Sequence, residues 1–283
     1  MVVNKHQVRL HFDKNAYQYE QYASLQEQMA QRLVHTVLSQ RDATQIHHIL
    51  EIGSGTGLLT RKLLQYFPHA IITAIDISSH MIEQAQASLS KAQRARVHFI
   101  CEDAEHMESI QNQWSTLDPH HDNVDLIISN ASFQWFNEPK KTIGRYIHQF
   151  LDQGLFAFST FGPRTFHEMH HAFEVAEQIE GRNAQRRGQP FVSLPYWDEV
   201  MTAHHGVKLA LHTREEKQYF KSVLDFLRSI QRIGASSANS SSQQAYLSKA
   251  LLKSMTAQYE SLYTTSHGIE ATYEIIEGCY AIG

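Results

Sequence analysis

Residues 49–57, with the sequence ILEIGSGTG, constrain the fold more than any other stretch of the chain. A short apolar run that contains Glu51 leads into three glycines at alternate positions, and a helical pattern begins at Leu58. A buried strand that turns over glycines and continues as a helix is typical of doubly wound α/β proteins that bind nucleotide-like ligands. Because glycine has no Cβ, such a turn can adopt positive φ angles and let a ligand approach the backbone N–H groups. The stretch therefore predicts a nucleotide-type site.

The spacing of these glycines narrows the class of ligand. It is G-x-G-x-G, whereas the dinucleotide fingerprint G-x-G-x-x-G would require glycine in place of Leu58. No G-x-x-x-x-G-K-[ST] pattern occurs, which excludes a P-loop. The pattern E-x-G-x-G-x-G resembles motif I of the class I S-adenosylmethionine (SAM)-dependent methyltransferases. In that family the glycine turn passes under the amino-acid end of the cofactor, and Glu51 would serve its ammonium group directly or through the turn.

Three further apolar runs end in polar residues, in the order expected for parallel strands. Residues 70–75 lead to Asp76, whose carboxylate can accept both hydroxyl groups of a ribose. Residues 97–101 precede an acidic pair that the resemblance assigns to the adenine amino group, and residues 124–129 lead to the reaction site. The resemblance implies SAM as cofactor and S-adenosylhomocysteine (SAH) as product. The predicted cofactor-binding residues are Glu51, Gly53, Ser54, Gly55, Gly57, Asp76, Ile77, Met81, Asp103, Ala104 and Asn130.

The alternation of strands and helices predicts a Rossmann-like, doubly wound α/β fold with a mostly parallel seven-stranded sheet. Residues 1–40 are expected to form an N-terminal helical cap that can close over the cofactor. Residues 161–205 are expected to form a helical insertion, before the last two strands, that provides the substrate and partner surface. No linker or repeat is visible, so residues 1–283 are expected to form a single domain. Strands are predicted at 48–52, 71–75, 97–101, 124–129, 154–160, 206–212 and 270–281, and helices at 58–66, 79–93, 105–113, 140–151, 165–179, 220–233 and 246–263.

Composition excludes several other classes of protein. A formal net charge of −4 argues against binding nucleic acid through overall charge. Two cysteines make no disulfide framework, and Cys101 is expected in a core strand. No apolar run approaches 18 residues and the N-terminus has no apolar signal region. We therefore expect a soluble cytoplasmic protein without a membrane or nucleic-acid partner.

One histidine pattern points to a different chemistry. Residues 167–171, with the sequence HEMHH, match the H-E-x-x-H motif of zinc hydrolases, on a predicted helix. The chain has 19 histidines, so a chance match is plausible, and no glycine-spaced third ligand follows. We therefore predict no metal site.

Four local segments make the resemblance more specific. They are residues 12–20 (FDKNAYQYE), 129–136 (SNASFQWF), 159–166 (STFGPRTF) and 222–230 (SVLDFLRSI). Together they resemble the malonyl-[acyl-carrier protein] O-methyltransferases of biotin synthesis, through nearly the whole chain. The resemblance implies methylation of the free carboxylate of a malonyl thioester, carried by an acyl carrier protein or by coenzyme A, to give the ester that primes pimeloyl and biotin synthesis. Because N-A-x-x-Q-W also occurs in trans-aconitate methyltransferases, the alternatives are an enzyme for a free small carboxylic acid or for a quinone-type molecule, and a SAM-binding regulator.

This reaction sets simple demands on the protein. A carboxylic acid is already ionised at pH 7, so we predict no catalytic base and attribute catalysis to positioning and desolvation. A buried substrate carboxylate favours a cation or several hydrogen-bond donors, although each candidate arginine could instead form a surface ion pair. The predicted substrate-binding residues are Tyr17, Gln134, Trp135, Arg145, Arg164 and Arg228. An acidic carrier protein would need a local basic patch, which we predict at Arg182, Arg186 and Arg187.

Overall fold

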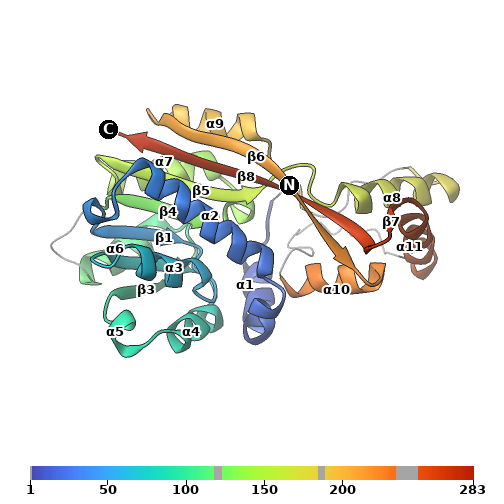
Figure 1. Ribbon diagram of the computed structural model, residues 1–283, viewed down its shortest axis with the longest axis horizontal. Coiled ribbons are helices and arrows are strands. Elements are labelled where there is room, and N and C mark those ends of the chain that lie inside the picture. Colours follow the sequence, from blue (N-terminus) through green and yellow to red (C-terminus); the bar gives the residue numbers. More distant parts are fainter. Residues whose placement is uncertain (1, 118–122, 184–188, 234–247) are drawn as a thin grey trace.

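The computed structural model describes residues 2–117, 123–183, 189–233 and 248–283. Its centre is a sheet with the strand order β3-β2-β1-β4-β5-β8-β6, and the short strand β7 pairs with β8 (Figure 1). The first five strands are parallel, whereas β8 runs antiparallel to both β5 and β6. The predicted fold class is confirmed. The strands are β1 (His48–Ile52), β2 (Ile71–Asp76), β3 (Val97–Cys101), β4 (Leu126–Asn130), β5 (Gly154–Phe161), β6 (Val207–Phe220), β7 (Thr264–Thr265) and β8 (Gly268–Ile282).

Helices cover both faces of the sheet and bury its apolar strands. One core joins the sheet to α2 (Ser24–Gln40) and α3 (Leu58–Tyr66). The other joins it to α6 (Met107–Leu117), α7 (Pro139–Phe150) and α9 (Leu194–Thr202). Burial on both faces explains why β1 and β5 read as continuous apolar runs rather than as alternating patterns.

The helix predicted at 79–93 is divided in two, as α4 (Ser79–Ser88) and α5 (Lys91–Arg94). Ser78 begins α4 by accepting a hydrogen bond from the backbone N–H of Met81. Ser90 and Gln93 begin α5 through a reciprocal capping box. The prediction of one unbroken helix was wrong. A serine side chain caps the free backbone N–H groups at a helix start, whereas inside a helix it competes with the backbone hydrogen bonds.

The N-terminal residues form helices, as predicted, and the last of them packs on one face of the sheet, against β4 and β5. The helices are α1 (Lys5–Asn15), the 3-10 helix η1 (Ala16–Gln21) and α2. Val3 and Val8 form a small buried cluster with Trp135, and Phe12 packs on it. This cluster attaches α1 to the segment that follows β4.

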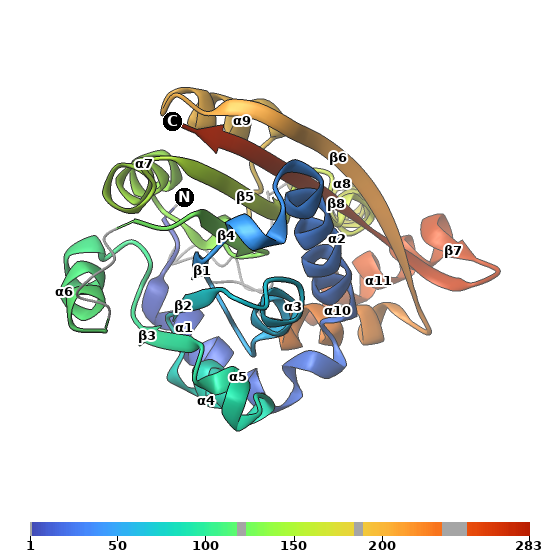
Figure 2. The ribbon, with the colours of Figure 1, turned by 60° about the vertical axis from the view of Figure 1, so that its left-hand side comes forward.

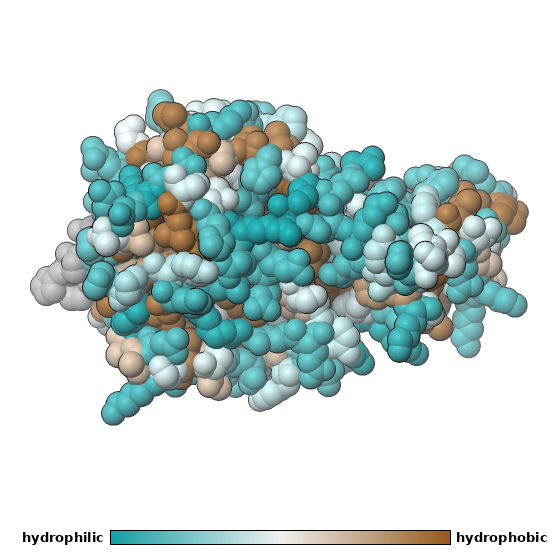
Figure 3. Space-filling model, in the orientation of Figure 1, coloured by the Kyte–Doolittle hydropathy of each residue, from teal (hydrophilic) through white to brown (hydrophobic). Residues whose placement is uncertain are grey.

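A helical lobe extends from one end of the sheet. The long antiparallel pair β6–β8 curves away from the parallel strands and leads to it (Figure 2). A third core unites the ends of these strands with three helices, namely α8 (His167–Ile179), α10 (Val223–Arg232) and α11 (Lys249–Tyr263). The face in Figure 3 is mostly hydrophilic over both the main body and this lobe, with small separate apolar groups. The division of the chain into domains stays a prediction.

The predicted end of β6 and the predicted burial of Cys101 were both wrong. β6 continues to Phe220 instead of ending at His212, and it pairs with β8 as far as the Phe220–Ile269 register. Its side chains are exposed or only partly buried, so the second half of the strand carries no apolar run, whereas its partner β8 is almost entirely buried. Cys101 was expected in the core, but it is the last residue of β3 and is exposed. No helix among the described residues is long and apolar enough to cross a membrane.

Candidate active site

The glycine turn after β1 is held against the end of β2 by backbone hydrogen bonds. The N–H groups of Gly53 and Ser54 donate to the carbonyl oxygen of Ile75, at 2.8 and 3.0 Å. The N–H of Gly55 donates to Oδ2 of Asp76 at 2.8 Å. The turn and the carboxylate that follows β2 therefore form one rigid edge.

The three glycines of the turn have left-handed backbone conformations, and each has a different neighbour. Their φ angles are +76° at Gly53, +54° at Gly55 and +85° at Gly57. A Cβ atom on Gly53 would lie 2.2 Å from Oγ of Ser132, and one on Gly57 would lie 3.2 Å from Cβ of Ala85. A Cβ on Gly55 would meet no protein atom within 4 Å. Gly55 therefore offers bare backbone beside open space, which is the geometry that a close-fitting cofactor requires.

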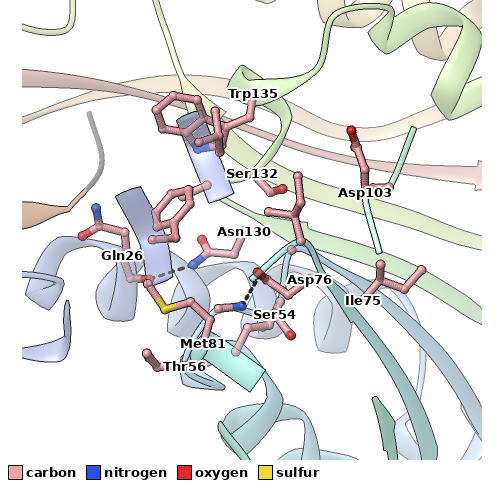
Figure 4. Close-up of a pocket in the computed structure, with 18 of the residues that line it drawn as sticks. Gln26, Ser54, Thr56, Ile75, Asp76, Met81, Asp103, Asn130, Ser132 and Trp135 are labelled. Atoms are coloured by element: carbon pink, nitrogen blue, oxygen red, sulfur yellow. Dashed lines mark hydrogen bonds between the residues drawn. The ribbon is translucent and has the colours of Figure 1, made fainter. Parts of the chain in front are cut away.

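A pocket of about 840 Å³, counted with its open mouth, lies at the carboxyl ends of β1 to β4 (Figure 4). The N-terminal residues Lys5, Val8, Phe12 and Tyr19 line it as well. Among the predicted residues, those that line the pocket are Gly53, Ser54, Gly55, Asp76, Ile77, Met81, Asp103, Ala104 and Asn130.

Asp76 lies where a ribose would be recognised. Its Oδ2 accepts from Gly55 and its Oδ1 accepts the backbone N–H of Ser78 at 2.9 Å. Burial raises the pKa of Asp76 to about 6, because the loss of solvation outweighs these hydrogen bonds. Each carboxylate oxygen has a second lone pair, so both can still accept a ribose hydroxyl. Ser78 in turn donates from Oγ to Oδ1 of Asp13 at 2.6 Å, which ties the N-terminal cap to this edge.

Asp103 stands on the other side of the pocket and contacts the N-terminal helix. Its Oδ1 accepts from the Lys5 ammonium at 3.1 Å and from the backbone N–H of Glu105 at 3.0 Å. Lys5 is also 2.7 Å from Oε2 of Glu105. The Asp103 side chain is nearly buried, so its carboxylate is suited to accept an adenine amino group in a site closed by α1.

Glu51 and Gly57 do not line the pocket. The Glu51 side chain is fully buried, and its Oε2 accepts the hydroxyl of Thr60 on α3 at 2.7 Å. Its Oε1 has no hydrogen-bond partner among the described residues, and burial raises the pKa of Glu51 to about 8. Of the two routes considered for Glu51, the structure supports the indirect one, through the turn and the start of α3.

Asn130 connects three elements at the floor of the pocket. Its Oδ1 accepts the hydroxyl of Ser159 on β5 at 2.5 Å. Its Nδ2 donates to the backbone carbonyl of Gln26 on α2 at 2.9 Å, as the dashed line in Figure 4 shows. Asn130 therefore fixes the position of α2 relative to the strand ends.

A second pocket, of about 410 Å³, adjoins the first. Five residues line both pockets, namely Phe12, Tyr19, Gln26, Ala131 and Trp135. The second pocket is mostly aromatic, and no described residue that lines it carries a positively charged side chain. Its other lining residues are Gln134, Phe161, Thr165, Phe166, Gln189, Phe191, Ile233 and Tyr273.

Comparison with known proteins decides the family. Residues 44–226 match a family model described as a methyltransferase domain. The chain is 34% identical over 278 residues to a protein of Halalkalibacterium halodurans named malonyl-[acyl-carrier protein] O-methyltransferase, with 98% of each chain covered. A protein of the same name from Priestia megaterium is 36% identical, with 97% of each chain covered. The chain belongs to the malonyl-[acyl-carrier protein] O-methyltransferase family. It is a SAM-dependent O-methyltransferase, and SAM is its cofactor.

Solved structures share the fold at low sequence identity. Magnesium protoporphyrin IX methyltransferase (ChlM) from Synechocystis PCC 6803, with bound SAH, superimposes with a TM-score of 0.53 and 14% identity, covering 96% of this chain and 99% of its own. The N-methyltransferase NodS from Bradyrhizobium japonicum WM9, also with SAH, gives a TM-score of 0.53 at 10% identity, covering 98% of both chains. These likenesses concern the fold alone.

Among the predicted substrate residues of this methyltransferase, two lie in the second pocket. Trp135 lines both pockets and packs edge-on against Phe12, with 5.7 Å between ring centroids. The Gln134 side chain donates to the carbonyl of Ala131 at 2.6 Å and accepts the hydroxyl of Thr160 at 3.1 Å. The N-A-x-x-Q-W segment therefore forms part of the wall between the two pockets.

The other four predicted substrate residues do not line either pocket. Tyr17 is 70% exposed, and Arg145 is exposed on α7. The Arg164 side chain is 58% exposed and pairs with Glu215, and the Arg228 side chain is 66% exposed and lies 3.4 Å from Asp225. The prediction that these residues face the substrate is corrected. At the surface, guanidinium groups stay hydrated and keep a carboxylate partner. Helix α10 buries Val223, Phe226 and Ile230, so the Arg228 side chain points away from the core and toward solvent.

The remaining predicted features fall in the lobe. Arg182 forms an ion pair with Glu180 at 2.8 Å, and Arg186 and Arg187 lie outside the described residues. In the H-E-x-x-H segment, Glu168 is fully buried and accepts from both the N–H and the hydroxyl of Thr272. No group of metal-binding side chains occurs among the residues that the structure describes. In this structure Glu168 connects α8 to β8.

Sequence reasoning missed Lys5, Tyr19 and Gln26. Tyr19 lies within the segment 12–20 that carried the resemblance, so the signal was present but was assigned to Tyr17. Lys5 and Gln26 have no motif of their own. Lys5 is 98 residues from Asp103 in the chain, and such a contact has no local signature.

Proposed function

We propose that the enzyme transfers the methyl group of SAM to the free carboxylate of a malonyl thioester on an acyl carrier protein, in the cytoplasm. The product, a malonyl methyl ester, would prime pimeloyl and biotin synthesis. Support for this substrate comes from the names of relatives that match 97–98% of the chain. The structural observation that carries the proposal is the junction of the two pockets, because an acceptor in the second pocket can meet a cofactor in the first where five described residues line both.

We further propose that the cofactor lies along the first pocket. The turn at Gly53–Gly55 would take its amino-acid end, Asp76 its ribose hydroxyls, and Asp103 with Ala104 its adenine. This order follows the lining from the end of β1 to the end of β3. SAM supplies an electrophilic methyl group on a positively charged sulfur.

The chemistry needs little from the protein beyond alignment. The carboxylate oxygen forms a bond to the methyl carbon while the carbon–sulfur bond breaks, and the electron pair remains on sulfur. No proton is transferred, so no base is required. The protein brings the two reactants into line and excludes water, for which the ring of Phe12 and the indole of Trp135 at the junction are suited.

The carrier protein remains a proposed partner. Acyl carrier proteins are acidic, and Arg182 with Arg186 and Arg187 is our proposed contact. Because Gln189 and Phe191 line the second pocket, this patch adjoins the acceptor site in sequence. A thioester arm bound there could place its malonyl group at the junction.

The test is a methyl-transfer assay with labelled SAM. Malonyl-carrier protein, malonyl-coenzyme A, free malonate and trans-aconitate are supplied in parallel, with acetyl-carrier protein as the control that lacks a free carboxylate. We expect base-labile label on the malonyl thioesters and none on acetyl-carrier protein. Label on free acids alone would replace the proposed substrate, and cofactor binding without any labelled product would favour a regulatory protein.

A further inference from the structure

The junction of the two pockets has an unusual chemical character. Among the five residues that line both pockets, the polar side-chain groups are the Tyr19 hydroxyl, the Gln26 amide and the Trp135 indole. All three are neutral. The molecule that accepts the methyl group has to be oriented at this junction. The three neutral side-chain groups are therefore the candidates to orient that molecule.

Gln26 is the buried member of this set, with only 4% of the residue exposed. Its Oε1 has no hydrogen-bond partner among the described residues, although its backbone carbonyl is bound by Asn130. Figure 4 shows the amide at the side of the pocket opposite Asp103, away from the adenine end. A buried polar group without a partner destabilises the fold, so this amide is suited to a ligand that completes its hydrogen bonds. Rotation by 180° about its last bond presents either its NH₂ or its oxygen.

Tyr19 is the second donor at the junction. It lines both pockets, and its ring packs edge-on against that of Phe12, with 6.3 Å between ring centroids. Burial, followed by the nearby charges of Asp76 and Glu20, raises the pKa of Tyr19, so the phenol stays protonated and can donate. The negative charge of Asp76 would repel a substrate carboxylate, so hydrogen-bond donors such as the Tyr19 hydroxyl are needed at the junction to hold it.

We propose that the Gln26 amide and the Tyr19 hydroxyl hold the acceptor carboxylate as a neutral cradle, in place of the arginine that the sequence suggested. This inference rests on the proposed function, because it assumes that the acceptor is a carboxylate. Each donor hydrogen-bonds one face of the carboxylate and leaves the other oxygen lone pairs for attack on the methyl carbon.

A neutral cradle suits this reaction better than a cation does. The reactants carry opposite charges that cancel as the methyl group moves from sulfur to oxygen. An arginine would stabilise the carboxylate before the reaction more than it stabilises the partly neutralised transition state, and so would bind the substrate without speeding the chemical step. Hydrogen bonds from neutral groups orient the carboxylate with less of this penalty. They also weaken when the neutral ester forms, which favours product release.

The test compares Gln26→Met with Gln40→Met. Methionine keeps the length of the side chain and removes both amide groups, and Gln40 is an exposed residue on the same helix. We expect Gln26→Met to lower kcat/KM for malonyl-coenzyme A by about 10- to 100-fold, the loss expected for a hydrogen bond to a charged group. Gln40→Met should match the wild type. The circular dichroism spectrum should change in neither variant, and any loss of SAH affinity in Gln26→Met should be smaller than its loss of kcat/KM.

Two further measurements separate a carboxylate-binding role from a structural one. With SAH bound, wild-type protein should bind malonyl-coenzyme A more tightly than its uncharged malonamyl analogue, and Gln26→Met and Tyr19→Phe should each reduce that preference. Gln26→Lys, which introduces a cation, should lower KM and lower kcat together. A preference that is unchanged in both variants, or a higher kcat in Gln26→Lys, would overturn the cradle.

The outcome for the proposed function is read from the wild type alone. If the wild type methylates another carboxylic acid and no malonyl thioester, the proposed function fails, and the comparison of Gln26→Met with Gln40→Met on that acid still decides the cradle. If the wild type methylates no carboxylate, both fail. If it methylates malonyl-coenzyme A and Gln26→Met equals Gln40→Met, the cradle alone is wrong.

Discussion

The two pockets meet at one junction, yet they are built in different ways. The first is lined mainly by residues that directly follow β1, β2, β3 and β4, so each polar group is placed by the strand before it. The second is lined by residues of α1, η1, α2, β5 and β8, by Ala131, Gln134 and Trp135 after β4, by Thr165 and Phe166 after β5, and by Gln189, Phe191 and Ile233. These segments are distant from one another in the chain. Local geometry decides the first pocket, and long-range packing decides the second. Substitutions in the first pocket should therefore weaken cofactor binding strongly. Substitutions in the helical lobe should instead change the stability of the fold or the binding of the acceptor.

The largest effect should come from adding one methyl group to the glycine turn. Gly55 and Gly181 both have positive φ angles, +54° and +66°, and an added Cβ would meet nothing within 4 Å at either. Gly55→Ala and Gly181→Ala should thus cost a similar backbone strain of about 1–2 kcal/mol. Only Gly55 lines the cofactor pocket, so we expect Gly55→Ala alone to weaken SAM binding, by about 100-fold, measured by calorimetry. Equal SAM affinities in the two variants would show that the turn is not part of the cofactor site.

The next effect tests the lobe and its H-E-x-x-H segment. Glu168→Ala would leave the N–H of Thr272 unpaired in the core, and we expect a loss of about 2–3 kcal/mol in the free energy of unfolding. SAM affinity should stay unchanged, as should the effect of added zinc on stability. Glu199→Ala, at an exposed ion pair with Lys140, is the control and should change the unfolding free energy by less than about 1 kcal/mol. A zinc-dependent gain in stability that Glu168→Ala abolishes would show that the segment binds metal.

A smaller effect should follow from the pH dependence of Asp76. Burial raises its pKa to about 6, so the carboxylate that accepts ribose hydroxyls is lost as the pH falls below 6. We expect SAM affinity to fall about tenfold from pH 7 to pH 5, and Asp76→Asn to bind weakly with little pH dependence over that range. Without cofactor, Asp76 affects the stability of the fold with the opposite dependence on pH. A raised native pKa stabilises the fold at low pH, and this contribution is lost as the pH rises through about 6. Cofactor affinity that is flat from pH 7 to pH 5 in the wild type would contradict the assignment.

The smallest effect should come from the contact between the cap and the adenine end. Lys5→Met removes the ammonium group that is 3.1 Å from Asp103 and 2.7 Å from Glu105. Both ion pairs are partly shielded, so we expect about a threefold loss of SAM affinity. Lys141→Met removes an exposed pair with Glu138 and should change nothing. Equal SAM affinity in Lys5→Met and Lys141→Met would contradict a contribution of Lys5 to cofactor binding.

The structure brings predicted site residues together where they follow neighbouring strands, although their roles stay predictions. The glycine turn, Asp76, Asp103 and Asn130 each follow an apolar run, and parallel pairing necessarily brings these strand ends to one edge of the sheet. Arg145, Arg164 and Arg228 lie outside both pockets. Nothing in the sequence indicated this, because charge and composition say nothing about the direction in which a helix presents a side chain. In α10 the buried positions decide that direction, and they turn Arg228 to the surface.

The sequence by itself determined the parallel strands, the nucleotide-type turn and the family to which this enzyme belongs. These features follow from local periodicity, from the freedom of glycine and from the order of motifs along the chain. Only the tertiary structure decided that Lys5 reaches Asp103, that Glu168 anchors β8, and that Tyr19 and Gln26 stand where the two pockets meet. Such contacts depend on how the N-terminal cap and the helical lobe pack against the sheet. Packing sums many weak apolar contacts over distant residues, so no single stretch of sequence encodes it.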